Sequence, residues 1–168
     1  CVVGKYADVT GSDEYTDCIR CAAGSWVDMT GSDEATDCID CVAGKYVESE
    51  GNDEETDCIE CAAGKYSTVV GSASGDEDCI DCVAGTYVET AGSNEDRSCI
   101  ACAVGKYSTV VGSFSEGNCT ACVAGKFVEE ERSDEESDCR LCGAGTYSIV
   151  VGSSAADDCT ACVAGKYL

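Results

Sequence analysis

The 168-residue chain contains no histidine and no proline, and its 10 lysines and arginines stand against 33 aspartates and glutamates. Without histidine it cannot form a Ser-His-Asp triad, a Cys-His pair or an imidazole metal site. A formal net charge of −23 argues against a nucleic-acid partner, because phosphate binding requires lysine and arginine gathered on one surface. No apolar run approaches the roughly 18 residues of a membrane span. We therefore expect neither an enzyme nor a cofactor, and no membrane span in this segment.

Cysteine, in contrast, is abundant, with 17 residues. A content near one residue in ten is typical of disulfide-stabilised proteins of oxidising compartments. The cysteines form C-x-x-C pairs that recur every 20 residues, with one interval of 21, and such a period predicts an array of stacked copies that touch mainly their neighbours. The expected copies are 1–20, 21–40, 41–60, 61–81, 82–101, 102–121, 122–141 and 142–161, followed by the start of a ninth at 162–168.

Each copy repeats the frame Cys-x-x-Gly-[Lys/Thr/Ser]-aromatic, then Gly-[Ser/Asn], an acidic tract and the next cysteine. The first glycine occurs in every copy, which predicts a positive φ or a backbone position too crowded for a Cβ. It stands at Gly4, Gly24, Gly44, Gly64, Gly85, Gly105, Gly125, Gly145 and Gly165. The second glycine, first seen at Gly11, is replaced once, by Arg132, so that turn is either tolerant or differently built there.

Nine of the eleven aromatic residues occupy one position of the frame, namely Tyr6, Trp26, Tyr46, Tyr66, Tyr87, Tyr107, Phe127, Tyr147 and Tyr167. One large side chain per copy cannot offset an ordering entropy of about 1.5 kcal/mol per residue, so covalent bonds must stabilise each copy. We interpret the aromatic row as a structural ladder that covers the disulfides. A stacking surface for sugars is the alternative.

The predicted fold is a small disulfide-rich repeat protein, an elongated rod of about eight 20-residue single-disulfide loops with short β-hairpins and little regular secondary structure. In each copy we expect one short strand around the aromatic residue and another just before the next cysteine, joined by the Gly-Ser turn.

Local pairing of the cysteines encloses a loop of 16 or 17 residues in every copy, and the chain-entropy model credits each loop with about 3 kcal/mol. The expected disulfides are Cys1–Cys18, Cys21–Cys38, Cys41–Cys58, Cys61–Cys79, Cys82–Cys99, Cys102–Cys119, Cys122–Cys139 and Cys142–Cys159. Nested pairing such as Cys18 with Cys38 stays open, because spacing alone does not determine connectivity. The seventeenth cysteine, Cys162, is expected to open a ninth loop, closed later in the same chain or in the next subunit.

Zinc is the main alternative to disulfides, since C-x-x-C pairs separated by 16 residues also suit four-cysteine zinc sites. The acidic, glycine-rich and serine-rich surroundings favour disulfides, so no metal ligand is predicted.

The segments CIDCVAGKYVE, CIECAAGKYSTVVGS and CTACVAGKYL resemble cysteine-rich repeats of the ephrin-receptor-like type, which are similar to the single-disulfide modules of tumour-necrosis-factor receptors. The resemblance covers the whole chain. It implies an extracellular or cell-surface disulfide-bonded rod with little regular structure and no catalytic residues.

Two surface features bear on modification and ligands. Asn118-Cys119-Thr120 is the single N-glycosylation sequon, and we expect a glycan on Asn118, with an unmodified loop asparagine as the alternative. The acidic tracts, such as Asp53-Glu54-Glu55, are interpreted as a solvated, self-repelling surface. Specific calcium sites are the alternative, although no tract has the ligand order of an EF-hand loop, and weak binding of divalent cations is compatible with both interpretations.

From residue 41 onward the copies alternate between two types. Copies three, five and seven carry Val-Glu after the aromatic residue, followed by more acid, whereas copies four, six and eight carry an uncharged, β-branched segment. If successive copies face opposite sides, the uncharged segments share one side and could pair with another chain. The predicted assembly face consists of Val69, Val70, Val110, Val111, Val150 and Val151. The alternative is that these valines only cover their own disulfides.

These features together predict a structural subunit of an extracellular fibre or cell-surface appendage, which self-associates and is glycosylated. The near-identity of successive copies favours such a role over that of a binder. The alternative is the stalk of a receptor or adhesion ectodomain that presents a separate binding domain.

Overall fold

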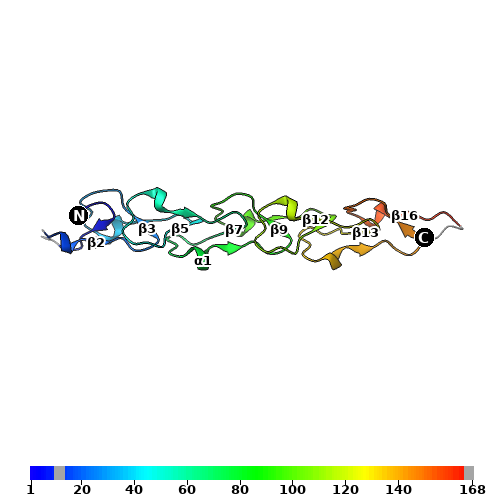
Figure 1. Cartoon of the computed structure of the whole chain (residues 1–168), viewed down its shortest axis with the longest axis horizontal. Coiled ribbons are helices and arrows are strands. Elements are labelled where there is room, and N and C mark those ends of the chain that lie inside the picture. The colour runs from blue at the N-terminus through cyan, green and yellow to red at the C-terminus, as the bar shows by residue number, and fades with distance from the viewer. Residues whose placement is uncertain (10–13, 165–168) are drawn as a thin grey trace. The chain divides into compact units, whose positions relative to one another are not determined.

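The computed structural model describes residues 1–9 and 14–164, so the predictions made for Gly11, Gly165 and Tyr167 lie outside the described residues. Its strands are two residues long and form eight two-stranded hairpins, one for each copy (Figure 1). The pairs are β1 (Lys5–Tyr6) with β2 (Ile19–Arg20), β3 (Ser25–Trp26) with β4 (Ile39–Asp40), β5 (Lys45–Tyr46) with β6 (Ile59–Glu60), β7 (Lys65–Tyr66) with β8 (Ile80–Asp81), β9 (Thr86–Tyr87) with β10 (Ile100–Ala101), β11 (Lys106–Tyr107) with β12 (Thr120–Ala121), β13 (Lys126–Phe127) with β14 (Arg140–Leu141), and β15 (Thr146–Tyr147) with β16 (Thr160–Ala161).

A single short helical turn precedes the loop-closing cysteine of each copy. One turn is α-helical, α1 (Gly75–Asp78), and the described others are 3-10 turns at Tyr15–Asp17, Ala35–Asp37, Glu55–Asp57, Asp96–Ser98, Glu116–Asn118, Glu136–Asp138 and Ala156–Asp158. The predicted small disulfide-rich repeat fold with short hairpins is therefore confirmed.

The second strand of each hairpin begins after the loop-closing cysteine, whereas the sequence predicted a strand just before that cysteine. In copy three, Tyr46 pairs with Ile59, which follows the loop-closing Cys58. The residues just before Cys58 turn instead, because Asp57 Oδ2 accepts the backbone N–H groups of Asp53 and Glu54 at 3.1 Å each. The strand expected before the loop-closing cysteine is thus wrong, and that position holds a capped 3-10 turn.

The turn at the second glycine keeps one conformation in all described copies. Its glycines have φ between 69° and 81°, and Arg132 adopts the same left-handed conformation with φ of 64°. The Arg132 N–H donates to Cys102 O at 3.0 Å, as the Gly112 N–H donates to Cys82 O at 2.8 Å. Copy seven therefore tolerates arginine in an unchanged turn.

Replacing Arg132 with glycine should raise the free energy of unfolding by about 1 kcal/mol. A residue with a Cβ loses roughly 1–2 kcal/mol in the left-handed region, and the gain from removing the Cβ is partly offset because glycine has more conformational entropy in the unfolded chain. Arg132→Asn should fall between the two, since asparagine tolerates this conformation better than arginine. Urea unfolding under non-reducing conditions measures the order, and a stability loss in Arg132→Gly would contradict the prediction.

Successive copies are joined by backbone hydrogen bonds that repeat along the chain. In copies one to seven the N–H after the aromatic residue donates to a carbonyl in the following copy, as from Val27 to Asn52 O and from Ser108 to Ser133 O, both at 3.1 Å. The turn of that following copy returns a bond, as from Gly51 N–H to Cys21 O at 2.8 Å. These bonds pair backbone groups that a single 20-residue loop would leave without partners.

Contacts also reach the copy after next, which the sequence did not indicate. A Cβ built on Gly105 of copy six would collide with the Gly152 carbonyl oxygen of copy eight and lie 2.8 Å from its carbonyl carbon. Gly24 and Gly71 show the same close approach between copies two and four. At Gly24 and Gly105 the first glycine of the frame is therefore needed both for its positive φ, 81° at Gly105, and for space.

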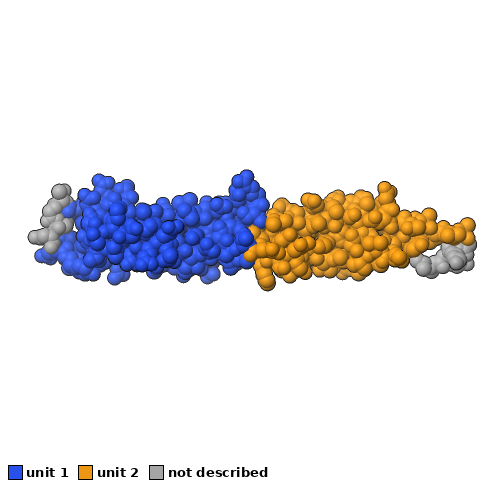
Figure 2. Space-filling model, turned by 90° about the horizontal axis from the view of Figure 1, so that it is seen from above, with its two compact units in different colours: residues 1–80, 90–98 blue, residues 81–89, 99–168 orange. Residues whose placement is uncertain are grey.

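The chain forms two compact units, residues 1–80 with 90–98 and residues 81–89 with 99–168 (Figure 2). The loop tip 90–98 of copy five counts with the first unit, where Ser93 O accepts the Ser67 N–H at 3.0 Å. In both units the buried apolar residues are mainly half-cystines and the valines beside them.

Candidate functional site

The eight disulfides follow the local pairing expected from the sequence. They join Cys1–Cys18, Cys21–Cys38, Cys41–Cys58, Cys61–Cys79, Cys82–Cys99, Cys102–Cys119, Cys122–Cys139 and Cys142–Cys159. Their Cα–Cα distances lie between 5.5 and 5.8 Å, within the ordinary range for disulfides. Cys162 has a free thiol in the part of the chain that the structure describes.

Aromatic side chains cover disulfides across the boundary between copies. Trp26 of copy two packs against the cluster of Cys41, Cys58 and Val47 in copy three. Tyr107 of copy six packs in the same way against the Cys122–Cys139 disulfide and Val128 of copy seven. These contacts match the structural ladder favoured by the sequence, with the detail that Trp26 and Tyr107 each cover the disulfide of the next copy.

The six valines of the predicted assembly face are exposed. Their side chains have relative exposures from 40% at Val69 to 63% at Val151. The valines that pack on disulfides are different ones, immediately after the aromatic residue, and Val47 and Val128 are each only 3% exposed. The six exposed valines therefore do not serve mainly to cover their own disulfides.

The alternation of the copies has a role inside the chain. The glutamate of each acidic copy accepts a backbone N–H at the start of the short turn in the following copy, which carries the uncharged β-branched segment, 27 residues later. The bonds join Glu48 to Gly75, Glu89 to Glu116 and Glu129 to Ala156, at 3.3, 3.2 and 3.1 Å. An acceptor at this point satisfies a free donor of the turn. Each acidic copy thus forms a two-copy structural repeat with the copy that follows it, as in copies three and four, five and six, and seven and eight.

The sequon asparagine has a structural contact of its own. Asn118 ends a 3-10 turn and is half-buried, and its Nδ2 donates to Ser113 Oγ at 2.8 Å. In most other copies this position before the cysteine is an aspartate. A glycosylated Asn118 would keep one N–H on Nδ2, so the contact with Ser113 and a glycan are chemically compatible.

The acidic tracts use part of their charge within the short turns. Asp37 Oδ2, for example, accepts the N–H groups of Asp33 and Glu34 at 3.0 and 3.2 Å. Among the described residues no group of three or more histidines, cysteines, aspartates or glutamates is placed to hold a metal ion. Asp13, which opens the first acidic tract, lies outside the described residues.

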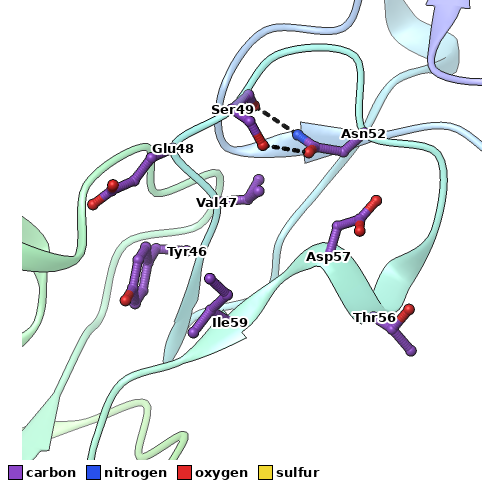
Figure 3. A pocket seen from close by; sticks show the side chains of 8 residues that line it. All are labelled: Tyr46, Val47, Glu48, Ser49, Asn52, Thr56, Asp57 and Ile59. Atoms are coloured by element: carbon purple, nitrogen blue, oxygen red, sulfur yellow. Dashed lines mark hydrogen bonds between the residues drawn. The ribbon is translucent and has the colours of Figure 1, made fainter.

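A hollow of about 540 Å³ opens beside the hairpin of copy three (Figure 3). Tyr46 and Ile59 form its apolar wall, and its polar lining is already bonded within the chain. Asn52 Nδ2 donates to Ser49 O at 2.7 Å and Ser49 Oγ donates to Asn52 Oδ1 at 2.7 Å, as Figure 3 shows. The ring of Tyr46 also lies against Gly75, where an added Cβ would be 2.7 Å from a ring carbon. All eight lining residues belong to copy three, so the hollow lies within a single loop of the array.

Sequence reasoning missed two sets of residues. One is the buried position after the aromatic residue, and the other is the capping glutamates Glu48, Glu89 and Glu129. The glutamates belong to the alternation already visible in the sequence, but their acceptors lie in another copy, so no local pattern marks them.

In residues 1–9 and 14–164 no helix is long and apolar enough to cross a membrane. Residues 71–119 match a family described as "Tyrosine-protein kinase ephrin type A/B receptor-like". No curated protein is similar enough to the chain to count as a match. The matched segment runs from the turn of copy four to the loop-closing Cys119 of copy six, and the same frame continues on both sides of it.

Disulfide arrays and the matched type of module are both typical of extracellular and cell-surface proteins. The predicted resemblance is confirmed: the chain is an array of eight disulfide-bonded cysteine-rich copies whose residues 71–119 are similar to the ephrin-receptor-like family.

Proposed function

We propose that the chain is a structural subunit of an extracellular fibre or cell-surface appendage. The observation that carries this proposal is the repeated backbone bonding between successive copies within each unit, such as Gly51 N–H to Cys21 O and Gly152 N–H to Cys122 O. Each copy is therefore joined to the next by the same few backbone hydrogen bonds, an arrangement suited to bearing load. A ligand-binding protein would instead need some copies to diverge at the binding surface.

The exposed valines support self-association in particular. The segments 67–75, 108–115 and 148–156 contain no charged residue, whereas the intervening copies are strongly acidic. With a net charge of −23, two chains repel each other wherever acidic surfaces meet. An uncharged surface with exposed β-branched side chains is the part best able to approach a second copy. Within the second unit, copies six and eight also contact each other at Gly105 and Gly152.

Replacing both Val111 and Val151 with aspartate should abolish fibres while leaving the disulfide-bonded chain folded. These side chains are 62% and 63% exposed, so the substitutions cost little in one chain but place charge in the proposed contact. We expect the critical concentration for assembly to rise at least about tenfold for each substitution. Negative-stain images and sedimentation measure the effect.

Val123→Asp is the matched control, because Val123 is 57% exposed but lies in acidic copy seven. This variant should form fibres as the unmodified chain does. Fibres that persist in the Val111→Asp, Val151→Asp double variant would contradict the proposed valine contact. Dispersed particles of the unmodified chain would contradict the fibre itself.

The second candidate is the stalk of a receptor or adhesion ectodomain. The match of residues 71–119 to a receptor-derived family favours it. In that role the chain would stay dispersed under conditions that support assembly, and it would carry a separate binding domain in the same polypeptide. The same images of the full-length protein distinguish the two functions.

Three further points belong to the proposal. A glycan on Asn118 and weak association of divalent cations with the acidic copies are compatible with an extracellular structural role. The role is non-catalytic, supported by the cysteine-rich type of the matched family.

A further inference from the structure

Tyr15 departs from the frame of the array. Nine aromatic residues share one frame position, whereas Tyr15 begins the 3-10 turn Tyr15–Asp17 that precedes Cys18. Its side chain is 69% exposed, so its hydroxyl is accessible to a second protein. No packing requirement accounts for a tyrosine here, because Ala35 and Ala156 occupy the same position in copies two and eight.

The immediate neighbours of Tyr15 distinguish it from the other tyrosines. Glu14 precedes it and Asp17 follows two residues later, and both are exposed. The frame tyrosines are instead preceded by lysine or threonine, and among those described all except Tyr147 are half-buried. Tyr147 is 38% exposed but follows Thr146. Of the described tyrosines, only Tyr15 is therefore both highly exposed and flanked by acidic residues.

The ammonium group of Lys5 is placed to bind an anion at the position of the Tyr15 hydroxyl. Lys5 Nζ donates to the Tyr15 hydroxyl at 3.1 Å and lies 4.3 Å from the ring centroid. In copies six and seven the equivalent of Tyr15 is a glutamate, which pairs with the equivalent lysine. These ion pairs are Lys106–Glu116 at 2.9 Å and Lys126–Glu136 at 3.4 Å. The Tyr15 hydroxyl thus occupies a place that elsewhere holds a carboxylate.

We propose that Tyr15 is a site of O-sulfation, a modification of proteins that pass through the secretory route, and the proposal rests on the extracellular location inferred above. The Tyr15 oxygen attacks the sulfur of a 3′-phosphoadenylyl sulfate donor. A new O–S bond forms, the S–O bond to the donor phosphate breaks, adenosine 3′,5′-bisphosphate leaves, and the phenolic proton passes to a base of the transferase. No oxidant or reductant is required.

The surroundings favour both the transfer and its product. Glu14 and Asp17 offer negative charge to the basic surface that a transferase needs in order to bind its anionic donor. The hydrogen bond and the charge of Lys5 lower the pKa of Tyr15, which assists loss of the phenolic proton. The resulting sulfate would face the Lys5 ammonium and form a charge-assisted contact like that of Glu116 with Lys106.

The test uses the purified, disulfide-bonded 168-residue chain with a tyrosylprotein sulfotransferase and a radiolabelled sulfate donor. One label per chain is expected, and Tyr15→Phe should remove it completely, whereas Tyr147→Phe should leave it unchanged. Glu14→Gln and Asp17→Asn should each slow labelling at least about threefold, mainly through KM. Intact disulfides and unchanged circular dichroism verify that each variant is folded.

Copy two offers a gain-of-function variant. Ala35 is exposed and lies between Glu34 and Asp37, the same acidic neighbours as those of Tyr15. Ala35→Tyr should therefore add a second labelled site. Ser25 stands where copy one has Lys5, so comparing the two labelling rates also measures what the lysine contributes.

Native protein supplies the second measurement. Its peptide containing Tyr15 should carry one SO₃ group that is lost in acid, which distinguishes it from an acid-stable phosphate. An unlabelled Tyr15, equal labelling of frame tyrosines, phosphate in place of sulfate, or an unlabelled Ala35→Tyr site would each overturn the proposal. The purified-chain assay requires neither secretion nor fibres, so its failure is distinct from failure of the proposed structural role.

Discussion

Alanine at Gly105 should destabilise the second unit by about 3 kcal/mol or more, whereas alanine at Gly125 should cost only about 1–2 kcal/mol. The two glycines have nearly identical φ, 81° and 82°, so both substitutions pay the same left-handed penalty. The two positions differ in the space available for an added Cβ. An added Cβ at Gly105 would strike the Gly152 carbonyl, and at Gly125 it would meet no described atom within 4 Å.

The obstacle at Gly105 is backbone rather than a movable side chain. To admit the Cβ, the turn of copy eight would have to shift, which would strain the Gly152 N–H bond to Cys122 O, 2.7 Å long. Hydrogen exchange at Gly152 should therefore become faster in Gly105→Ala but stay unchanged in Gly125→Ala.

Urea unfolding under non-reducing conditions, followed by tyrosine fluorescence, compares the two variants. Equal losses of stability at both positions would contradict the close approach of copies six and eight, and would leave positive φ as the sole reason for glycine. The pair thus separates a local conformational requirement from a tertiary one.

Replacing both cysteines of the Cys122–Cys139 disulfide with alanine should lower the free energy of unfolding by about 4 kcal/mol. About 3 kcal/mol comes from loop-closure entropy in the chain-entropy model. The rest reflects lost packing, because these half-cystines are 1% and 5% exposed and contact Val128 and Tyr107.

The Cys142–Cys159 disulfide is the matched comparison. Its sequence separation is also 17, so the entropy term is the same. Its half-cystines are partly exposed, and removal should cost nearer 3 kcal/mol. Calorimetry gives the stabilities, and hydrogen exchange of residues 122–141 localises the effect. A smaller loss at Cys122–Cys139 than at Cys142–Cys159 would contradict the role of packing.

Much of the architecture follows from separations that are short along the chain. A cysteine and its partner are 17 or 18 residues apart, and the single 21-residue interval changes only the Cys61–Cys79 loop. The first glycine has positive φ at every described position, as its invariance among the copies predicted. Local features that repeat every 20 residues can be predicted from the sequence because each copy supports the same interpretation.

The position of the second strand shows where local reasoning failed. The sequence favoured strand pairing just before Cys58, but Asp57 caps a 3-10 turn there and the pairing moves to Ile59. A side-chain hydrogen bond over four residues competes directly with strand formation, and hydrophobic patterning does not reveal which one prevails.

The frame, the local disulfides and the alternation of acidic copies with copies that carry an uncharged segment were therefore determined by the sequence itself. Tertiary structure decided how copies meet: the approach of Gly105 to Gly152, the bond from Ala156 N–H to Glu129, and the exposure of Val111 and Val151. These contacts link residues 27 or more positions apart. They depend on how one folded copy lies against the next, and in a chain of near-identical copies the sequence marks many equivalent partners without indicating which of them touch.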